Sequence, residues 1–152
     1  MSARPPSPAA PTQRLHATAV SLGGKAILLI GTSGSGKSDL ALRLIEHGAK
    51  LIGDDYVEVI RRGKQLHVKA LKPMQGHIEV RGVGIVKLSP IRRVTAAPLR
   101  GVFELVASDR IERLPEPATY AILGLEVPLW KLAPFEQSAL RKLKLLLGGG
   151  AR

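Results

Sequence analysis

The chain of 152 residues lacks cysteine and asparagine and has few aromatic residues. Without cysteine it can form neither a disulfide framework, nor a thiolate zinc site, nor a cysteine nucleophile. Without asparagine it lacks the Asn-Lys-x-Asp guanine-reading motif of GTPases and the catalytic-loop asparagine of eukaryotic-type protein kinases. Aromatic residues make up 3% of the chain and do not alternate with its basic residues, which argues against a base-stacking platform for nucleic acid.

Long apolar runs are also missing. No run reaches the length that spans a bilayer, and the N-terminus lacks the apolar core of a signal peptide. We therefore expect a soluble, cytoplasmic protein. Its formal charge of +11 favours polyanionic partners, a class that includes nucleotide phosphates, acidic protein surfaces, nucleic acid and anionic membranes.

The strongest motif is the glycine-rich segment at residues 31–38, which reads Gly-Thr-Ser-Gly-Ser-Gly-Lys-Ser and matches the P-loop pattern. Its glycines let backbone N–H groups approach the α- and β-phosphates of a nucleotide. Lys37 is expected to reach the β- and γ-phosphates, and Ser38 to place its hydroxyl on Mg²⁺. The predicted nucleotide-binding residues are Gly31, Thr32, Ser33, Gly34, Ser35, Gly36, Lys37 and Ser38.

The context of this loop supports the P-loop interpretation over a plain glycine-serine turn. Residues 26–30 are apolar and contain two β-branched isoleucines, which predicts a buried strand before the loop. Residues 39–47 have a helical pattern, and Gly48 supplies a stop signal. A strand, a loop and a helix in this order are what a P-loop requires.

Two adjacent carboxylates, Asp54 and Asp55, follow a short strand predicted at residues 50–53. One could hold Mg²⁺ directly or through water, and the other could deprotonate an attacking hydroxyl. A solvated turn would also explain an aspartate pair after Gly53. His16 lies near the start of the first predicted hairpin, where spacing alone favours a structural or surface role over a catalytic one.

The rest of the chain predicts one α/β domain with a mixed sheet. Residues 1–13 are rich in proline and predict a disordered tail, so the folded domain is expected at residues 14–152. The remaining predicted elements are hairpins of 15–21 with 25–30 and of 56–60 with 65–70, a glycine bulge within 77–85, a strand at 99–107, an irregular or edge strand at 123–132, and a C-terminal amphipathic helix with an apolar stripe at 135, 139, 140, 143, 146 and 147.

Together, His16 and the segments 31–38, 51–57 and 78–85 resemble successive motifs of the bacterial HPr kinase/phosphorylase catalytic domain. The Glu-Val-Arg-Gly-x-Gly element that begins at Glu79 is that family's signature and is more specific than the P-loop. The resemblance covers residues 15 to about 112. It implies a P-loop fold shared with phosphoenolpyruvate carboxykinase and a ring-like homo-oligomer, usually a hexamer. It also implies that ATP and Mg²⁺ are used to phosphorylate a serine of HPr, the small phosphocarrier protein of the sugar phosphotransferase system.

The resemblance also implies roles for particular residues. Ser38 and Glu79 match magnesium ligands of the family. Asp55 matches the acid/base that takes the serine proton in one direction and returns it in the other. With Asp54, which is included for its position beside Asp55, the predicted catalytic residues are His16, Lys37, Asp54, Asp55, Arg81 and Arg110.

The chain departs from the family pattern in two places. It has no room for the usual N-terminal domain, so it looks like the short form found in some proteobacteria. After Val127-Pro128, the family's Pro-Gly-Arg-Asn segment is replaced by Leu-Trp-Lys-Leu-Ala-Pro, which predicts weak phosphorylase activity. Two alternative functions remain. One is a small-molecule kinase, which usually needs an arginine-bearing lid, and the other is a basic nucleotide-binding regulator that binds nucleic acid.

Overall fold

The computed structural model describes residues 10–72 and 75–148. Most of the predicted tail, residues 1–9, therefore lies outside the described residues. The first strand, β1 (Thr12–His16), begins two residues before the boundary predicted at residue 14. It begins there because Thr12 pairs with Ile60 and His16 with Tyr56, so that β1 lies antiparallel to β5 (Tyr56–Arg62).

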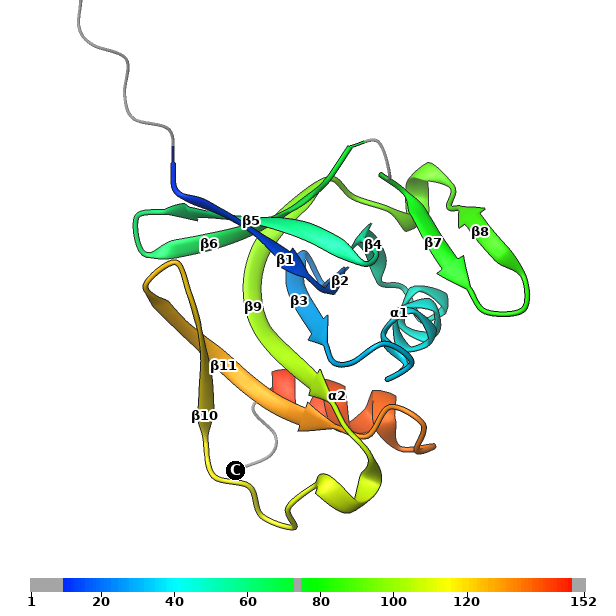
Figure 1. Cartoon of the computed structure of the whole chain (residues 1–152), viewed down its shortest axis with the longest axis vertical. Helices are drawn as coiled ribbons and strands as arrows, with labels where there is room; N and C mark the ends of the chain where they lie inside the picture. Colours follow the sequence, from blue (N-terminus) through cyan, green and yellow to red (C-terminus); the bar gives the residue numbers. More distant parts are fainter. Residues whose placement is uncertain (1–9, 73–74, 149–152) are drawn as a thin grey trace, which may run out of the picture.

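One mixed sheet of nine strands forms the body of the described chain (Figure 1). Its other strands are β2 (Thr18–Leu22), β3 (Lys25–Ile30), β4 (Lys50–Gly53), β6 (Gln65–Ala70), β9 (Ala96–Leu105), β10 (Ala118–Ile122) and β11 (Leu125–Leu132). The order is β1-β5-β6-β9-β3-β2-β4, with β11 added to β9 and β10 to β11. β3 and β11 run parallel to β9, whereas the other neighbours are antiparallel.

β9 is the long central strand that curls the sheet (Figure 1). Its first residues pair with β6, and the part from residue 99 onward pairs with β3 and then also with β11. The predicted strand at 99–107 thus starts three residues earlier, at Ala96. Both predicted hairpins form, but residues 15–21 are divided between β1 and β2 at Ala17.

Two apolar clusters lie on opposite faces of the sheet. Ile27 and Leu29 of β3 pack in the cluster that includes residues of α1 (Lys37–Glu46) and α2 (Ala139–Leu147). Ala26 and Leu28 alternate with them and pack in the cluster inside the curl. Both faces of β3 are buried, which explains why residues 26–30 are apolar throughout.

Residues 77–87, whose first part was predicted as a glycine bulge, form a separate hairpin of β7 (His77–Val80) and β8 (Gly84–Lys87). Gly82, in the left-handed region at φ 84°, allows the tight turn that joins the two strands. Ile78 is fully buried in the cluster around α1, so the hairpin is fixed to that helix. Two short 3₁₀ helices, η1 (Pro90–Arg92) and η2 (Ser108–Arg110), precede and follow β9.

The C-terminal part differs from its prediction in three ways. β11 is a regular strand with partners on two sides, not an irregular edge, and its partner β10 was not predicted. α2 begins at Ala139, so Phe135 lies in the preceding loop and not on the helical stripe. Ala139 and Leu143 are fully buried, and the other helical stripe residues pack partly against the same core. The stripe is therefore covered largely by the chain itself.

In the described part of the chain, neither helix has the length and hydropathy of a membrane span.

Candidate active site

The P-loop joins β3 to α1 and depends on its glycines for its shape. Gly36 caps α1 in the left-handed conformation at φ 102°. A Cβ atom there would lie 2.9 Å from the Cζ atom of Phe135, and a Cβ atom on Gly31 would lie 2.6 Å from the Oγ atom of Ser35. A side chain at either position would displace its neighbour, and the left-handed backbone of Gly36 favours glycine, so the loop forms a compact cradle.

Lys37 occupies the centre of this loop. Its side chain is 9% exposed, and its Nζ donates to the backbone carbonyls of Gly31 (2.8 Å) and Thr32 (3.1 Å). The ammonium group lies at the N-terminus of α1, where the helix dipole adds positive potential. The Oγ atom of Ser35 is buried without a hydrogen-bond partner in the described chain. The cradle and the fixed cation suit a nucleotide di- or triphosphate.

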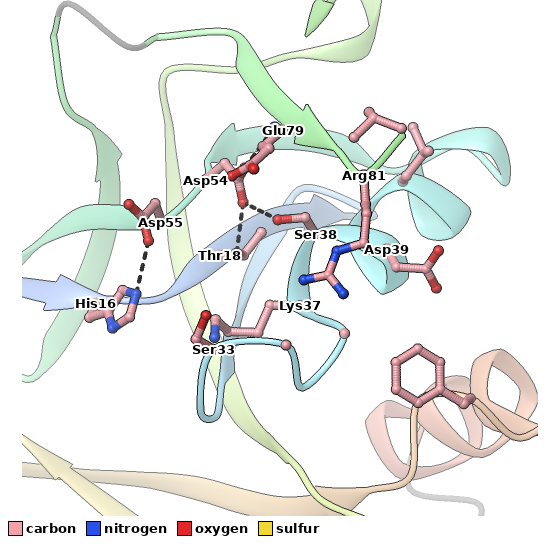
Figure 2. Close-up of a pocket in the computed structure, with 15 residues that line it drawn as sticks. His16, Thr18, Ser33, Lys37, Ser38, Asp39, Asp54, Asp55, Glu79 and Arg81 are labelled. Atoms are coloured by element: carbon pink, nitrogen blue, oxygen red, sulfur yellow. Dashed lines mark hydrogen bonds and ion pairs between the residues drawn. The ribbon is translucent and has the colours of Figure 1, made fainter. Parts of the chain in front are cut away.

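Asp54 connects three elements of the site (Figure 2). Its Oδ1 accepts hydrogen bonds from the hydroxyls of Ser38 (2.8 Å) and Thr18 (2.9 Å), and its Oδ2 accepts from the backbone N–H of Glu79 (2.9 Å). α1, β2 and β7 each supply one of these donors. The Asp54 carboxylate is therefore fixed beside the P-loop serine, with both oxygens engaged.

Asp55 has a different environment from its neighbour. Its side chain is 71% exposed, and its Oδ1 lies 2.8 Å from Nε2 of His16. The ring of His16 stacks on Tyr56 with centroids 4.9 Å apart. The backbone of Asp55 is left-handed at φ 73°, in a tight turn closed by the bond from the Tyr56 N–H to the Asp54 carbonyl. This turn points the two adjacent carboxylates at different partners, as Figure 2 shows.

These groups surround one cavity of about 350 Å³. The predicted catalytic and metal residues that line it are His16, Lys37, Ser38, Asp54, Asp55, Glu79 and Arg81, and the P-loop contributes Ser33, Gly34 and Gly36 as well. Gly31, Thr32 and Ser35 shape the loop without lining the cavity. Arg110 is exposed at the end of η2 and is not among the lining residues, so its role stays a prediction without geometric support.

The oxygen donors near Ser38 suit magnesium. Mg²⁺ is usually held by one or two carboxylates together with phosphate oxygens and water, not by a complete protein cage. In agreement with that, residues 10–72 and 75–148 contain no group of three or more His, Asp or Glu side chains placed to hold a metal ion. Figure 2 shows Glu79 beside Asp54, so Ser38 and Glu79 are available as ligands, and Asp54, whose oxygens already accept hydrogen bonds, could also contact the ion through water.

The reasoning from sequence missed several residues in or next to the site, among them Thr18, Tyr56 and Phe135. Thr18 is a fully buried residue at the start of a strand that contains only one other polar residue, Ser21, and a threonine next to apolar residues is a signal that could have been used. Tyr56 follows the aspartate pair directly and supports His16. Phe135 lines the cavity although its spacing suggested a place on the C-terminal helix.

A strand, a P-loop and a helix, with a buried lysine, a serine hydroxyl and two carboxylates around one cavity, define a P-loop phosphate-binding domain equipped for phosphoryl transfer. The comparisons with known proteins narrow this class. The family model described as "HPr Serine kinase C-terminal domain" matches residues 8–133, and the chain belongs to this family.

Curated relatives carry the name HPr kinase/phosphorylase. The protein of Cupriavidus metallidurans is 33% identical over 151 residues, which cover 94% of this chain and 46% of that protein. The protein of Chlorobium phaeobacteroides is 38% identical over 133 residues, which cover 81% of this chain and 41% of that protein. The chain thus spans less than half the length of these relatives.

A solved structure described as the HPr(Ser) kinase/phosphatase from Coxiella burnetii has the same fold. It superposes with a TM-score of 0.80 and 25% sequence identity, and the match covers 91% of this chain and 96% of that chain. The α/β fold with a mixed sheet and a C-terminal helix, and the family resemblance read from the motifs, are therefore confirmed.

Proposed function

We propose that this chain is a cytoplasmic kinase that transfers the γ-phosphoryl group of ATP to a serine of HPr. In this reaction the bond between the γ-phosphorus and the bridging oxygen breaks, a bond to the serine oxygen forms, and ADP leaves. The observation that carries the proposal is the cavity in which Lys37, Ser38 and both aspartates meet. Family membership supports HPr as the acceptor.

The residues present divide the work of this transfer. The P-loop N–H groups and Lys37 hold the β- and γ-phosphates, and the fixed positions of these donors stabilise charge that develops in the transition state. Ser38 and Glu79, with Asp54 directly or through water, would hold a Mg²⁺ ion, which would neutralise charge on the same phosphates. Asp55 is the exposed carboxylate, so it can accept the proton of the incoming serine. His16 orients Asp55 through their 2.8 Å contact.

The direct test incubates the purified chain with γ-labelled ATP, Mg²⁺ and HPr. Label is expected on HPr, at a serine, and HPr with that serine changed to alanine should remain unlabelled. Hydrolysis or transfer to a small metabolite, without labelled HPr, would instead favour the small-molecule kinase. Affinity for nucleic acid that falls steeply with salt would favour the basic regulator.

The reverse reaction, phosphorolysis of phosphoserine-HPr, is predicted to be slow. It requires inorganic phosphate to bind beside ADP, and the family's Pro-Gly-Arg-Asn segment would supply an arginine for it. Here the corresponding residues belong to β11, where Lys131 is exposed, pairs in register with Glu104 of β9 and does not line the cavity. A lysine also lacks the bidentate geometry of arginine. The check is the rate of phosphate-dependent dephosphorylation relative to phosphorylation.

Comparable rates in the two directions would contradict this prediction. They would point to Arg81, which lines the cavity, as the residue that holds inorganic phosphate. An Arg81→Lys variant would then lose phosphorolysis more than kinase activity.

We also propose that the chain forms a homo-oligomer, a hexamer by analogy with the family. The support is family membership alone, because α2 covers its stripe within its own core. Sedimentation velocity at micromolar concentration is expected to show a species several times the mass of one chain. A monomer at that concentration would contradict the proposal.

A further inference from the structure

The two ends of the active-site cavity differ in chemistry. His16 and Asp55 lie at one end, where the serine must be deprotonated next to the γ-phosphate (Figure 2). The nucleoside of a bound ATP must therefore extend away from them, past Lys37 and along the start of α1. Asp39 of α1 lies on the side of Lys37 that faces away from His16 (Figure 2). Phe135, in the loop before α2, lines the cavity beside Gly36, at the start of α1.

Packing within the fold does not explain the exposed position of Phe135. Its side chain is 71% exposed although it lines the cavity, and its ring lies against Gly36 of the P-loop. Leu42, which is half-buried, supplies a second apolar wall to the cavity. Exposing a phenyl ring to water forfeits the stabilisation that burial would give. An exposed ring next to a phosphate cradle therefore indicates a ligand with an apolar face.

The other aromatic residues of the described chain already have partners. Phe103 and Trp130 contact each other with ring centroids 5.0 Å apart, and Tyr56 stacks on His16. Tyr120 packs against the core inside the curled sheet. Among the aromatic side chains of the described residues, Phe135 is therefore the one available to contact a ligand.

The loop that carries Phe135 is held on both sides. The guanidinium of Arg43, on α1, donates to the carbonyl of Pro134 and lies 3.2 Å from the Asp39 carboxylate. On the other side, the ammonium of Lys142 donates to Glu136 at 2.9 Å and holds the pKa of that carboxyl below its ordinary value. These contacts hold the loop on either side of Phe135, so less of the loop has to be ordered when a ligand binds.

We propose that Phe135 forms the nucleobase subsite, in which the phenyl ring stacks on the adenine of an ATP whose phosphates occupy the P-loop. This inference rests on the proposed use of ATP. Stacking needs only the flat face of a base, so it fits a site where an aromatic ring, and not an asparagine or glutamine amide, faces the ligand.

The test measures binding by calorimetry, with ADP and with tripolyphosphate as a probe that has phosphates but no nucleoside. Phe135→Ala should weaken ADP binding by about 5- to 150-fold, the range that loss of one base–aromatic stack gives. Its affinity for tripolyphosphate should not change. Phe135→Trp should keep the affinity for ADP, and its added fluorescence should be quenched by ADP but not by tripolyphosphate.

A matched control is Leu114→Ala, which removes another exposed apolar side chain (85% exposed) that does not line the cavity. It should bind both probes like the unmodified chain. ADP affinity unchanged in Phe135→Ala would overturn the inference, and so would an equal loss for ADP and tripolyphosphate, since that indicates a disturbed loop. If the unmodified chain binds neither ADP nor ATP, the proposed function itself fails. If the unmodified chain binds ATP and Phe135→Ala binds it equally well, the nucleobase subsite is rejected but the proposed function is not.

Discussion

Lys37→Ala is expected to abolish phosphoryl transfer to HPr. The ammonium group is buried at the centre of the P-loop, and its removal takes away the cation facing the β- and γ-phosphates. Loss of one fixed donor at a developing charge typically costs about 10²- to 10³-fold in rate, and ATP binding should weaken as well. The measurement is initial rate of labelled phosphoserine-HPr formation, together with calorimetric affinity for ATP.

A suitable control is Lys64→Ala, in the exposed turn between β5 and β6, which removes the same charge far from the P-loop. Lys37→Arg is a second comparison, which keeps the positive charge. It is also expected to lower the rate, because the planar guanidinium does not fit the two carbonyls that bind the ammonium. Phosphorylation at the parent rate by Lys37→Ala would remove the P-loop from the mechanism.

Local patterns in the sequence were sufficient to predict the P-loop and its supporting elements. The apolar run at residues 26–30, the glycines and the helical periodicity after them act within about twenty residues, so no tertiary information was needed. The aspartate pair was located for the same reason, at the end of a short strand. The likeness to a known family then brought in Glu79 and Arg81, which local spacing does not connect to the P-loop.

Contacts between distant segments explain what the sequence did not reveal. The partners of Asp54 come from β2, α1 and β7, which are far apart in the chain, so the role of Thr18 depends on the topology. Phe135 fits a helical spacing of apolar residues, yet α2 begins only at Ala139. The segment that forms the hairpin of β7 and β8 was predicted as a bulge, because glycines occur both in bulges and in tight turns.

Asp55→Asn is expected to lower turnover by about 10²- to 10⁴-fold while ADP still binds. The amide keeps the size of the carboxylate but cannot accept the serine proton. The substitution should leave the fold intact, since asparagine adopts the left-handed conformation of this residue (φ 73°) at least as readily as aspartate. Turnover with HPr, ADP affinity and melting temperature, measured on the same preparation, check these three expectations.

Asp54→Asn provides the matched comparison and should fail differently. Both oxygens of Asp54 accept hydrogen bonds, so an amide would direct its NH₂ group either at the backbone N–H of Glu79 or at the hydroxyls of Thr18 and Ser38. We expect a lower melting temperature and weaker binding of ADP in the presence of Mg²⁺, because the contact that fixes β7 beside Ser38 is lost. If Asp54→Asn instead loses turnover with binding and melting temperature unchanged, while Asp55→Asn remains active, Asp54 is the base and the roles within the pair are reversed.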